Sequence, residues 1–284
     1  MREAMYYTTM KNQQLQCQLC PHYCVLKQGH TGRCLVRKNI EGKLYSLNYG
    51  KLSAIAIDPI EKKPLHHFFP GSEILSVGSY GCNMECEFCQ NCDISREFNI
   101  PKQYIKPEDI VNSAMDHDLK SIAYTYNEPT VFYEWMIETA KCAKEHGIRN
   151  VMVTNGFINP EPFIQLAPLL DAMNIDIKTY DDKQYQRICA GRLAPVLKTI
   201  ELAKGYGIHV ELTCLIVPKL NDDIEQLDKL FEQIHQRVGD IELHVSRYFP
   251  RYHYNEPATD IALMLKIKEV AKKYFSYVSL GNVR

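Results

Sequence analysis

The sequence lacks a long apolar run, and it lacks an excess of charge of either sign. No stretch approaches the roughly 18 apolar residues that a membrane-spanning helix needs, and the polar opening MREAMYYTTMKNQQLQ shows no secretory signal. The 33 Lys and Arg residues balance 34 Asp and Glu residues, for a net charge of −1. The chain therefore offers no general attraction to a phosphate backbone or an anionic membrane. We expect a cytoplasmic protein whose partners are neither nucleic acid nor membrane.

The composition excludes several classes of protein. Apolar residues make up 45% and charged residues 24%, an ordinary globular mix that rules out disorder, collagen and coiled coil. The 284 residues allow about two domains, or one barrel with an appendage. The 11 cysteines are too few for a disulfide scaffold in so long a chain, and their odd number prevents complete pairing within it. Clustered cysteines in a reducing compartment indicate metal ligands or catalytic groups.

Eight of the cysteines gather in two clusters. The second cluster, GCNMECEFCQN, follows an apolar run that predicts a buried strand, and Cys82, Cys86 and Cys89 give it a C-x3-C-x2-C pattern. Three thiolates hold a four-iron cluster and leave one iron without a protein ligand, which is what reduction of a small molecule at that iron requires. A structural zinc loop with Cys92 as the fourth ligand is the alternative. We expect Cys92 to lie outside the ligand set.

The segments CQLCPHYC, DPIEKKPLHHFFPG, GCNMECEFCQN, YTYNEPT, VTNG, DIKTY and HVSRYFPRY carry a resemblance to a known family. From about Leu15 to the C-terminus the chain resembles the radical S-adenosylmethionine enzymes, and within them the radical enzyme of the AmmeMemoRadiSam group, which is related to pyruvate formate-lyase activating enzymes. The resemblance implies a four-iron four-sulfur cluster, S-adenosyl-L-methionine, and a low-potential electron donor of flavodoxin or ferredoxin type. In this group an aromatic residue usually stands where this chain has Cys92.

After the cluster loop, short apolar runs alternate with stretches of helical spacing. The runs predict strands at 121–126, 150–154, 173–178, 208–217 and 241–249. The stretch from Pro129 to Gly147 opens and closes as a helix does. Alternating strands and helices imply parallel strands with right-handed crossovers. With the strand before the cluster there are six, which matches the open partial (β/α)6 TIM-like barrel of the α/β class that the resemblance implies. We assign the barrel to 72–284, and a metal-binding subdomain with a connector to 1–71.

Polar residues follow the ends of these strands, where parallel barrels gather their reacting groups. The set comprises Tyr126, Asn127, Glu128, Thr154, Asn155, Asp176, Lys178, His244 and Arg247. S-adenosylmethionine needs a carboxylate for its ammonium group and a cation or donors for its carboxylate, so we expect this set to bind it. Taken singly, Glu128 is also explained as a helix cap, and Asp176 with Lys178 as a surface ion pair.

The resemblance assigns roles to part of this set. YTYNEP stands where relatives have a Gly-Gly-Glu-Pro segment that binds the methionine ammonium group, which implies that task for Glu128. Tyr126 and Asn127 replace the two glycines, so the backbone is expected to approach the cofactor less closely. The segments VTNG and DIKTY match the relatives' Thr-Asn-Gly and Asp-x-Lys, and Lys178 then binds the cofactor's carboxylate. Arg247 or His244 covers the position on the last strand.

The first cysteine cluster has the pattern C-x2-C-x3-C-x9-C, formed by Cys17, Cys20, Cys24 and Cys34. Too few apolar residues surround it to fold the segment without help, so we expect a small knuckle folded around a metal. Four sulfurs fit tetrahedral zinc, and they fit a second iron–sulfur cluster equally well. We favour zinc, and unmetallated thiols are the remaining alternative.

Three residues are predicted to act on the substrate. The segment 58–71 is richer in charges, histidines and aromatics than a connector needs, so we expect His66 or His67 to approach the substrate pocket; a packed surface loop is the alternative. Tyr252 follows the sixth strand among aromatic and cationic residues, which suit a phenolic, carboxylate or peptide substrate. Cys189 precedes Ala-Gly in a predicted loop and is a candidate hydrogen-atom donor.

Together these features predict an enzyme that cleaves S-adenosylmethionine to methionine and a 5′-deoxyadenosyl radical, which then abstracts hydrogen from a substrate. We favour a small molecule, aromatic or phenolic, that undergoes a radical rearrangement, because the Memo proteins of the AmmeMemoRadiSam group resemble aromatic-ring-opening dioxygenases. An activase that installs a glycyl radical on a protein partner is the first alternative. A non-catalytic zinc-binding interaction module, with both cysteine clusters structural, is the alternative from another class.

Overall fold

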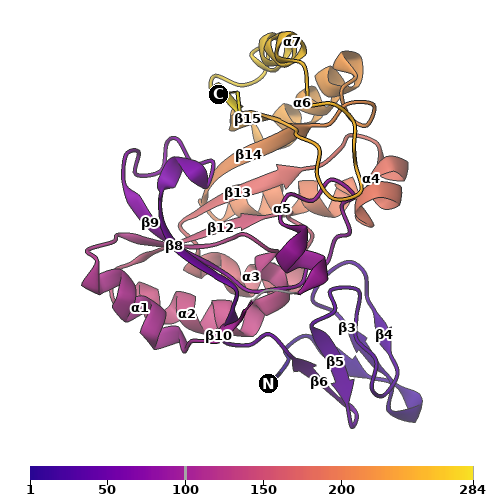
Figure 1. Ribbon diagram of the computed structural model, residues 1–284, viewed down its shortest axis with the longest axis vertical. Helices are drawn as coiled ribbons and strands as arrows, with labels where there is room; N and C mark the ends of the chain where they lie inside the picture. Colours follow the sequence, from indigo (N-terminus) through magenta and orange to yellow (C-terminus); the bar gives the residue numbers. More distant parts are fainter. Residues whose placement is uncertain (99–100, 284) are drawn as a thin grey trace.

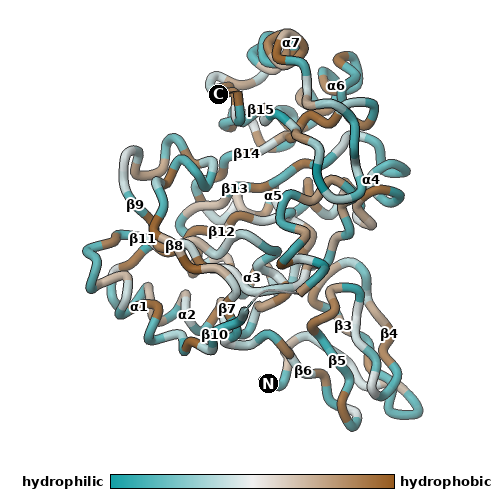
Figure 2. The backbone as a smooth tube through the Cα atoms, viewed as in Figure 1, coloured by the Kyte–Doolittle hydropathy of each residue, from teal (hydrophilic) through white to brown (hydrophobic). Residues whose placement is uncertain are grey.

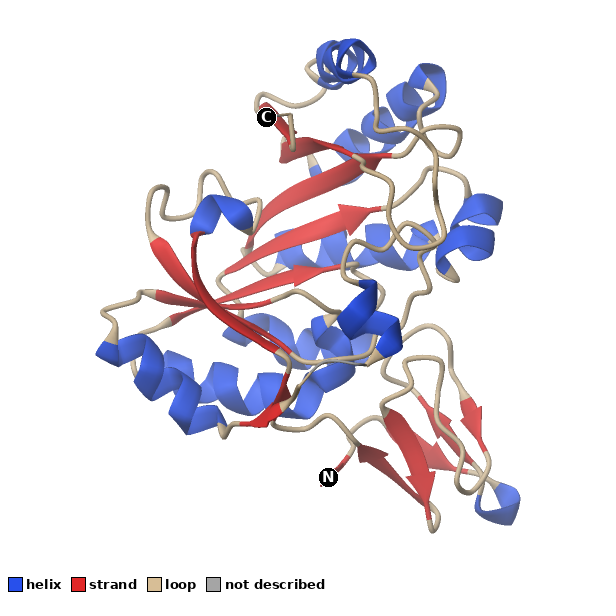
Figure 3. Ribbon diagram, viewed as in Figure 1, coloured by secondary structure: helices blue, strands red, loops and turns tan. Residues whose placement is uncertain are grey.

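The computed structural model describes residues 1–98 and 101–283. Within these ranges, its largest element is an eight-stranded sheet (Figures 1 and 3). In spatial order the strands are β16 (Val278–Gly281), β15 (Glu242–Arg247), β14 (His209–Ile216), β13 (Ala172–Ile177), β12 (Arg149–Thr154), β11 (Ser121–Tyr124), β9 (Glu73–Gly78) and β8 (Ala54–Pro59). All pairs are parallel except β8 with β9. Because spatial order follows chain order, successive right-handed crossovers curl the sheet into an open barrel.

This architecture confirms the predicted partial TIM-like α/β barrel. The sequence predicts six parallel strands, and the described residues contain β16 as a seventh and β8 as an antiparallel edge strand. Residues of β8 alternate between half-buried and exposed, and all four residues of β16 are only half-buried. Neither segment has the continuous apolar run that marks a parallel strand buried on both faces.

Helices connect the parallel strands and pack along the outer side of the sheet (Figure 1). They are α1 (Pro107–Asp116), α2 (Tyr133–Glu145), α3 (Pro160–Leu166), α4 (Asp182–Cys189), α5 (Leu193–Gly205), α6 (Ile224–Val238) and α7 (Ile261–Ala271). Shorter helical turns are η1 (Lys11–Gln13), η2 (Ile60–Lys62), η3 (Asp93–Glu97), η4 (Pro129–Phe132) and η5 (Ala167–Leu169). The side chains of Asp181, Asp223 and Asp260 cap α4, α6 and α7 by accepting backbone N–H groups.

The helix predicted between Pro129 and Gly147 forms as η4 followed by α2. Pro129 has the φ that a first helical turn needs, and Gly147 follows the end of α2 with a φ of +74°, a conformation that favours glycine. The first residues of α2, from Tyr133 to Ile137, are all buried, and farther along only Thr139, Ala140 and Ala143 are, so the second half of the helix packs on one side. Figure 2 shows the same distribution across the molecule, with hydrophobic residues along the main sheet and hydrophilic ones in outlying loops.

Small antiparallel sheets precede the barrel. One contains β1 (Arg2–Glu3), β6 (Lys43–Ser46) and β5 (Arg37–Ile40), a second contains β2 (Tyr7–Thr9), β3 (Leu15–Cys17) and β4 (Val25–Leu26), and β7 (Lys51–Leu52) pairs with β10 (Gln103–Tyr104). The predicted boundary at residue 71 differs from this arrangement, because β8 pairs with β9 along its whole length. The change from small sheets to the barrel lies before Ala54. Among the described residues, no helix is both long and apolar enough to cross a membrane.

Candidate active site

A cavity of about 1160 Å³ lies inside the barrel. Most of the residues that the sequence predicts for the site line it: Cys82, Cys86, Cys89, Tyr126, Asn127, Glu128, Thr154, Asn155, Asp176, Lys178 and His244. They come from the loop after β9 and from the ends or inner faces of β11, β12, β13 and β15. The parallel register of these strands brings side chains more than 160 residues apart into one space.

The loop with Cys82, Cys86 and Cys89 is braced by the end of α4. The N–H groups of Glu85 and Glu87 donate to the carbonyl oxygens of Cys189 and Ile188, at 2.9 and 3.1 Å. Burial raises the pKa of Cys82 and Cys89, and a hydrogen bond with Cys189, together with burial, raises the pKa of Cys86. The metal-free thiols are thus neutral at neutral pH, and a bound metal displaces their protons.

The donor set of this loop fits a four-iron cluster better than a single ion. Groups of three or more ligand atoms that lie mutually within 4.8 Å occur in the described residues, but the three sulfurs of the loop do not form one. Sulfurs around one tetrahedral zinc ion lie roughly 3.8 Å apart, whereas a cluster holds its thiolates farther apart. Cys92 does not line the cavity in the described part of the chain; its thiol lies 3.6 Å from Oδ1 of Asp93.

Glu128 is buried where β11 leads into η4. Its Oε1 accepts hydrogen bonds from the N–H and hydroxyl groups of Thr130 (3.0 and 2.6 Å) and from the hydroxyl group of Thr154 (2.7 Å). Its Oε2 accepts one, from the N–H group of Asn155 at 2.8 Å. Burial raises the pKa of Glu128 in spite of these donors. A carboxylate oxygen accepts about two hydrogen bonds, so Oε2 retains capacity for a further donor from the cavity.

Tyr126 and Asn127, which replace two glycines of the relatives, have separate tasks. Tyr126 has a φ of +70°, a conformation that favours glycine, and its hydroxyl group donates to Asp58 at 2.8 Å. Asn127 joins two loops, because its Oδ1 accepts from the N–H group of Ser79 (2.8 Å) and its Nδ2 donates to the carbonyl of Gly81 (2.9 Å). The backbone therefore follows a glycine-like path although no glycine is present.

Asp176 and Lys178 form an ion pair of 2.8 Å that lines the cavity. Burial opposes the charge on Lys178, yet Asp176 and the nearby Cys86 thiol hold the pKa of Lys178 above its usual range. Lys178 therefore stays cationic beside the cluster loop. The pair has the inward position that the alternation of the strand predicts, and it is not a pair on the outer surface.

Two of the residues predicted for the site on or after β15 lie elsewhere. Among the described residues that line the cavity, β15 contributes His244 and Ser246, and strand alternation turns Arg247 outward. Nε of Arg247 donates to the carbonyl of Thr259 at 2.8 Å. Tyr252 stacks on His253 with ring centroids 3.7 Å apart, outside the cavity. Within the described residues, the structure therefore does not bring Arg247 and Tyr252 into the lining of this cavity.

Cys189 and His67 also lie outside the described lining of the cavity. Cys189 ends α4 instead of lying in a loop, and its fully buried thiol is next to Cys86, which does not suit a hydrogen-atom donor to substrate. His67 lies at the opposite, N-terminal end of the barrel, where its Nδ1 contacts Glu242 and its ring packs on Tyr277. Its neighbour His66 does line the cavity.

Several lining residues were missed at the level of sequence. They include Gln90, Asn91, Phe249 and the terminal residues Leu280, Gly281, Asn282 and Val283. Gln90 and Asn91 follow the cysteine motif directly, which is a usable signal, and Nδ2 of Asn91 donates to the carbonyl of Tyr126 at 2.7 Å. The terminal residues carry no signal, because β16 is too short and too exposed to be predicted.

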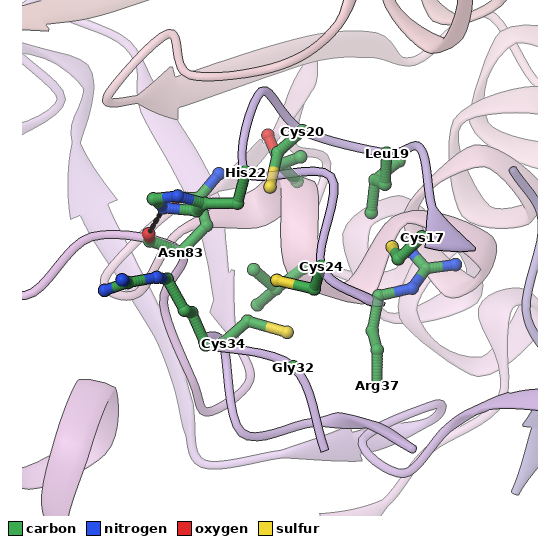
Figure 4. A pocket seen from close by; sticks show the side chains of 12 residues that line it. Cys17, Leu19, Cys20, His22, Cys24, Gly32, Cys34, Arg37 and Asn83 are labelled. Atoms are coloured by element: carbon green, nitrogen blue, oxygen red, sulfur yellow. Dashed lines mark hydrogen bonds between the residues drawn. The ribbon is translucent and has the colours of Figure 1, made fainter. Parts of the chain in front are cut away.

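The N-terminal cysteines surround a second, smaller cavity. Figure 4 shows the sulfur atoms of Cys17, Cys20, Cys24 and Cys34 gathered around it. Arg37 also lines this cavity, and its charge favours the thiolate form of Cys17, whose pKa burial raises. No three of the four sulfurs belong to a group of ligand atoms mutually within 4.8 Å in the described residues. Every three of these sulfurs therefore include at least one separation greater than the roughly 3.8 Å between sulfurs on one tetrahedral zinc ion.

The two cysteine sites are neighbours in space. Nε2 of His22, from the N-terminal loop, lies 2.7 Å from the carbonyl oxygen of Asn83, and Figure 4 shows this contact. Asn83 lines the small cavity and is adjacent in sequence to Cys82. Nδ2 of Asn155 donates to Oδ1 of Asn83 at 2.9 Å, so a single residue links the knuckle, the cluster loop and the rim of β12.

Comparison with known proteins assigns the chain to a family. The model of the family described as "Radical SAM superfamily" matches residues 76–231, which are more than half of the chain. The chain belongs to the radical SAM superfamily. Members of this superfamily are enzymes that use a four-iron four-sulfur cluster and S-adenosylmethionine, and the chain is related to the activating enzymes of pyruvate formate-lyase.

The sequence relatives leave the substrate open. An uncharacterised protein of Methanocaldococcus jannaschii is 44% identical over all of this chain and 86% of its own length. A second protein of that organism, provisionally named a glycyl-radical enzyme activating enzyme, is 29% identical over 76% of this chain and 91% of its own length.

Solved structures support the fold. SuiB of Streptococcus suis, crystallised with S-adenosylmethionine, aligns with a TM-score of 0.57 at 16% identity, over 72% of this chain. The chain spans about half of the length of SuiB, 48%. This likeness supports the radical SAM barrel, and it carries nothing about the substrate.

Proposed function

We propose that this radical SAM enzyme acts on a small molecule, aromatic or phenolic, that binds inside the barrel and undergoes a radical rearrangement. The observation that supports this is the closed floor of the cavity: the segment 60–71 crosses the N-terminal end of the barrel, where Glu211 accepts the N–H groups of His66 and His67. A cavity near 1160 Å³ suits a cofactor plus a small ligand. Phe88 and Phe249 supply aromatic surface within it.

In this proposal the chain positions the reactants and excludes water. The cluster and S-adenosylmethionine, when bound, supply a 5′-deoxyadenosyl radical that removes a hydrogen atom from the substrate. Cys82, Cys86 and Cys89 hold the cluster. Glu128 accepts a hydrogen bond from the cofactor's ammonium group through Oε2, and Lys178 binds its carboxylate. The segment 60–71, which crosses the N-terminal end of the barrel, would limit the access of competing hydrogen donors to the reacting carbon.

We also propose that Cys17, Cys20, Cys24 and Cys34 hold a second iron–sulfur cluster, the alternative to the zinc favoured from sequence. No three of their sulfurs lie mutually within 4.8 Å in the described residues, which supports a cluster, and the buried Arg37 beside them favours the thiolate form of Cys17. Asn83, which lines this site, follows Cys82 directly in the sequence. A cluster here would pass electrons from a flavodoxin- or ferredoxin-like donor to the radical site.

The experiment that tests the enzyme function is anaerobic reconstitution with iron and sulfide, followed by a strong reductant and S-adenosylmethionine. We expect 5′-deoxyadenosine and methionine to form, and a Cys86→Ala variant to form neither. Cys142→Ala is the matched control, since Cys142 lies on α2 away from both cysteine sites. Absence of 5′-deoxyadenosine from the reconstituted wild type would favour a non-catalytic module.

The class of substrate is tested by dividing a cell extract into a low-molecular-mass filtrate and a protein fraction. Our proposal expects the filtrate to accelerate 5′-deoxyadenosine formation. The relative named for glycyl-radical enzyme activation favours the other candidate, an activase. That candidate expects the protein fraction to accelerate the reaction and a glycyl radical signal to appear in the EPR spectrum.

A further inference from the structure

The floor of the cavity contains a cluster of four histidines and two carboxylates whose side chains no step above uses. One carboxylate, Glu211 of β14, is fully buried and explains the anchoring of the floor. It accepts the N–H groups of His66 and His67 at 2.9 to 3.0 Å, and it lies 2.8 Å from Nε2 of His209 and 2.7 Å from Nε2 of His244. Both carboxylate oxygens of Glu211 therefore have hydrogen-bond partners.

The other carboxylate, Glu242 of β15, is not explained in this way. Its Oε2 contacts His67, whereas its Oε1 lies 3.8 Å from Nδ1 of His66 and 3.9 Å from Nε2 of His244. These distances are too long for hydrogen bonds. The ligand atoms of His66, Glu242 and His244 nevertheless lie within 4.8 Å of one another, so they surround a small gap.

The size of this gap matches a metal ion. Two of the three separations are 3.8 and 3.9 Å, and the third is at most 4.8 Å. A point equidistant from the three atoms then lies roughly 2 to 2.5 Å from each, a range that includes the usual bond length from imidazole nitrogen or carboxylate oxygen to a divalent metal. Two histidines and one carboxylate on one side of an ion form the facial triad found in Fe²⁺ sites. Two buried carboxylates close to one another also favour a cation.

The histidine rings are held in orientations that suit coordination. Nδ1 of His244 lies 2.7 Å from the hydroxyl oxygen of Ser279 on β16, so Nε2 faces the two carboxylates, with Oε2 of Glu211 at 2.7 Å and Oε1 of Glu242 at 3.9 Å. The ring of His66 packs edge-on against that of His244, with centroids 4.5 Å apart at 89°. A hydrogen bond to the second ring nitrogen is the usual way in which proteins orient metal-binding histidines.

We propose that His66, Glu242 and His244 bind one divalent cation, Mn²⁺ or Fe²⁺, at the floor of the cavity. His66 and His244 line the cavity, so a facial triad leaves coordination positions that open into it. There the cation binds an anionic oxygen of the substrate, a phenolate or a carboxylate, and holds the substrate below the cluster. This substrate role rests on the proposed function, whereas the metal site itself does not.

The test is titration of anaerobic full-length protein with Mn²⁺, followed through loss of the EPR signal of the free ion. Mn²⁺ is used because thiolate sites select softer metals, so the two cysteine sites do not contribute. We expect one tightly bound Mn²⁺ per chain, and binding at least tenfold weaker in His66→Gln and in Glu242→Gln. Neither S-adenosylmethionine nor a reductant is needed, so failure of the proposed function would not affect this result.

The control is Asp93→Asn, because Cys92, Asp93 and Glu97 form a group of three close ligand atoms away from the floor, whereas the third such group in the described residues, His67, Glu211 and Glu242, shares Glu242 with the proposed site. It should bind Mn²⁺ as the wild type does. Loss of binding in Asp93→Asn alone would overturn the assignment. Absence of tight binding to the wild type, or wild-type affinity in both floor variants, would show that the floor is a hydrogen-bonded anchor only.

Discussion

Arg37 of β5 and Glu134 of α2 form an ion pair in which the exposed fraction of each side chain is 2%. Nη2 of Arg37 lies 2.5 Å from Oε1 of Glu134, and both residues also bond to the backbone of Met5, at 2.8 Å. Within the described residues, Nε and Nη1 of Arg37 and Oε2 of Glu134 have no hydrogen-bond partner. This pair joins the N-terminal subdomain to the barrel through the interior.

Substitution of one residue of this ion pair should lower the free energy of unfolding. Arg37→Met leaves the Glu134 carboxylate buried and unpaired, which destabilises proteins by about 3–5 kcal/mol. Urea unfolding of the metal-loaded protein, followed by circular dichroism, measures the loss. The double variant Arg37→Met/Glu134→Leu should recover most of the stability, because neither charge is then buried. Wild-type stability of the single variant would contradict this account.

Glu128→Gln should weaken binding of S-adenosylmethionine and spare the cluster. A hydrogen bond between charged groups contributes about 1.5–3 kcal/mol, so we expect an affinity roughly 10- to 100-fold lower, with the visible absorption of the cluster unchanged. Equilibrium dialysis with labelled cofactor gives the affinity. Glu97→Gln, an exposed position on η3, is the matched control and should bind as the wild type does.

The N-terminal site should contribute iron. If it holds a second four-iron cluster, reconstituted wild type contains about eight irons per chain, and the variant Cys20→Ser/Cys24→Ser contains about four. Iron analysis and Mössbauer spectroscopy distinguish this from zinc, which leaves the iron content at about four in both proteins and adds one zinc to the wild type. Compared with the wild type, the variant should also be reduced more slowly by reduced flavodoxin, whereas dithionite should reduce both proteins at similar rates.

Asp58 gives the stability a defined pH dependence. Burial opposes the charge of Asp58, but hydrogen bonds from Lys63, Tyr126 and Lys62 hold the pKa of this carboxyl well below its usual value of 3.8. A lowered pKa stabilises the fold above the unfolded-state pKa, and the contribution is lost as the pH falls. Asp58→Asn should therefore cost about 1–2 kcal/mol at neutral pH. Urea unfolding should show this difference shrinking below pH 3.8.

Tyr252 and Arg247 should matter little for the chemistry, since both lie outside the described lining of the cavity. We expect Tyr252→Phe and Arg247→Gln to form 5′-deoxyadenosine within about twofold of the wild-type rate, which is less than 1 kcal/mol in the barrier. Product formation under single-turnover conditions measures this. A tenfold lower rate of 5′-deoxyadenosine formation in Tyr252→Phe would show that Tyr252 acts in the active site.

Much of the site is predictable from the sequence because strand geometry is regular. Once strands are placed by their apolar runs, the parallel register brings Glu128, Asn155 and Lys178 to one end of the sheet without further information. Arg247 shows the limit of that reasoning. The predicted strand 241–249 contains β15, which ends at Arg247, but the face on which a side chain lies depends on alternation, and His244 and Ser246 occupy the inner face.

The contacts that sequence could not supply are the long-range ones. The floor depends on Glu211 meeting the backbone of His66, 145 residues away, and no local pattern encodes that distance. A buried glutamate within an apolar strand is a signal of a specific partner, yet it does not say which partner. The same holds for Cys189, whose neighbour Cys86 is known only from the packing of α4 against the cluster loop.

The small cavity of the N-terminal cysteines and the large cavity of the barrel share no lining residue in the described chain. They are nevertheless close, because Asn83 lines the small cavity and its neighbours Cys82 and Met84 line the large one. A reductant that docks over the knuckle would therefore not compete with a substrate for the same space. Excess substrate should therefore not inhibit reduction by the donor competitively in steady-state kinetics.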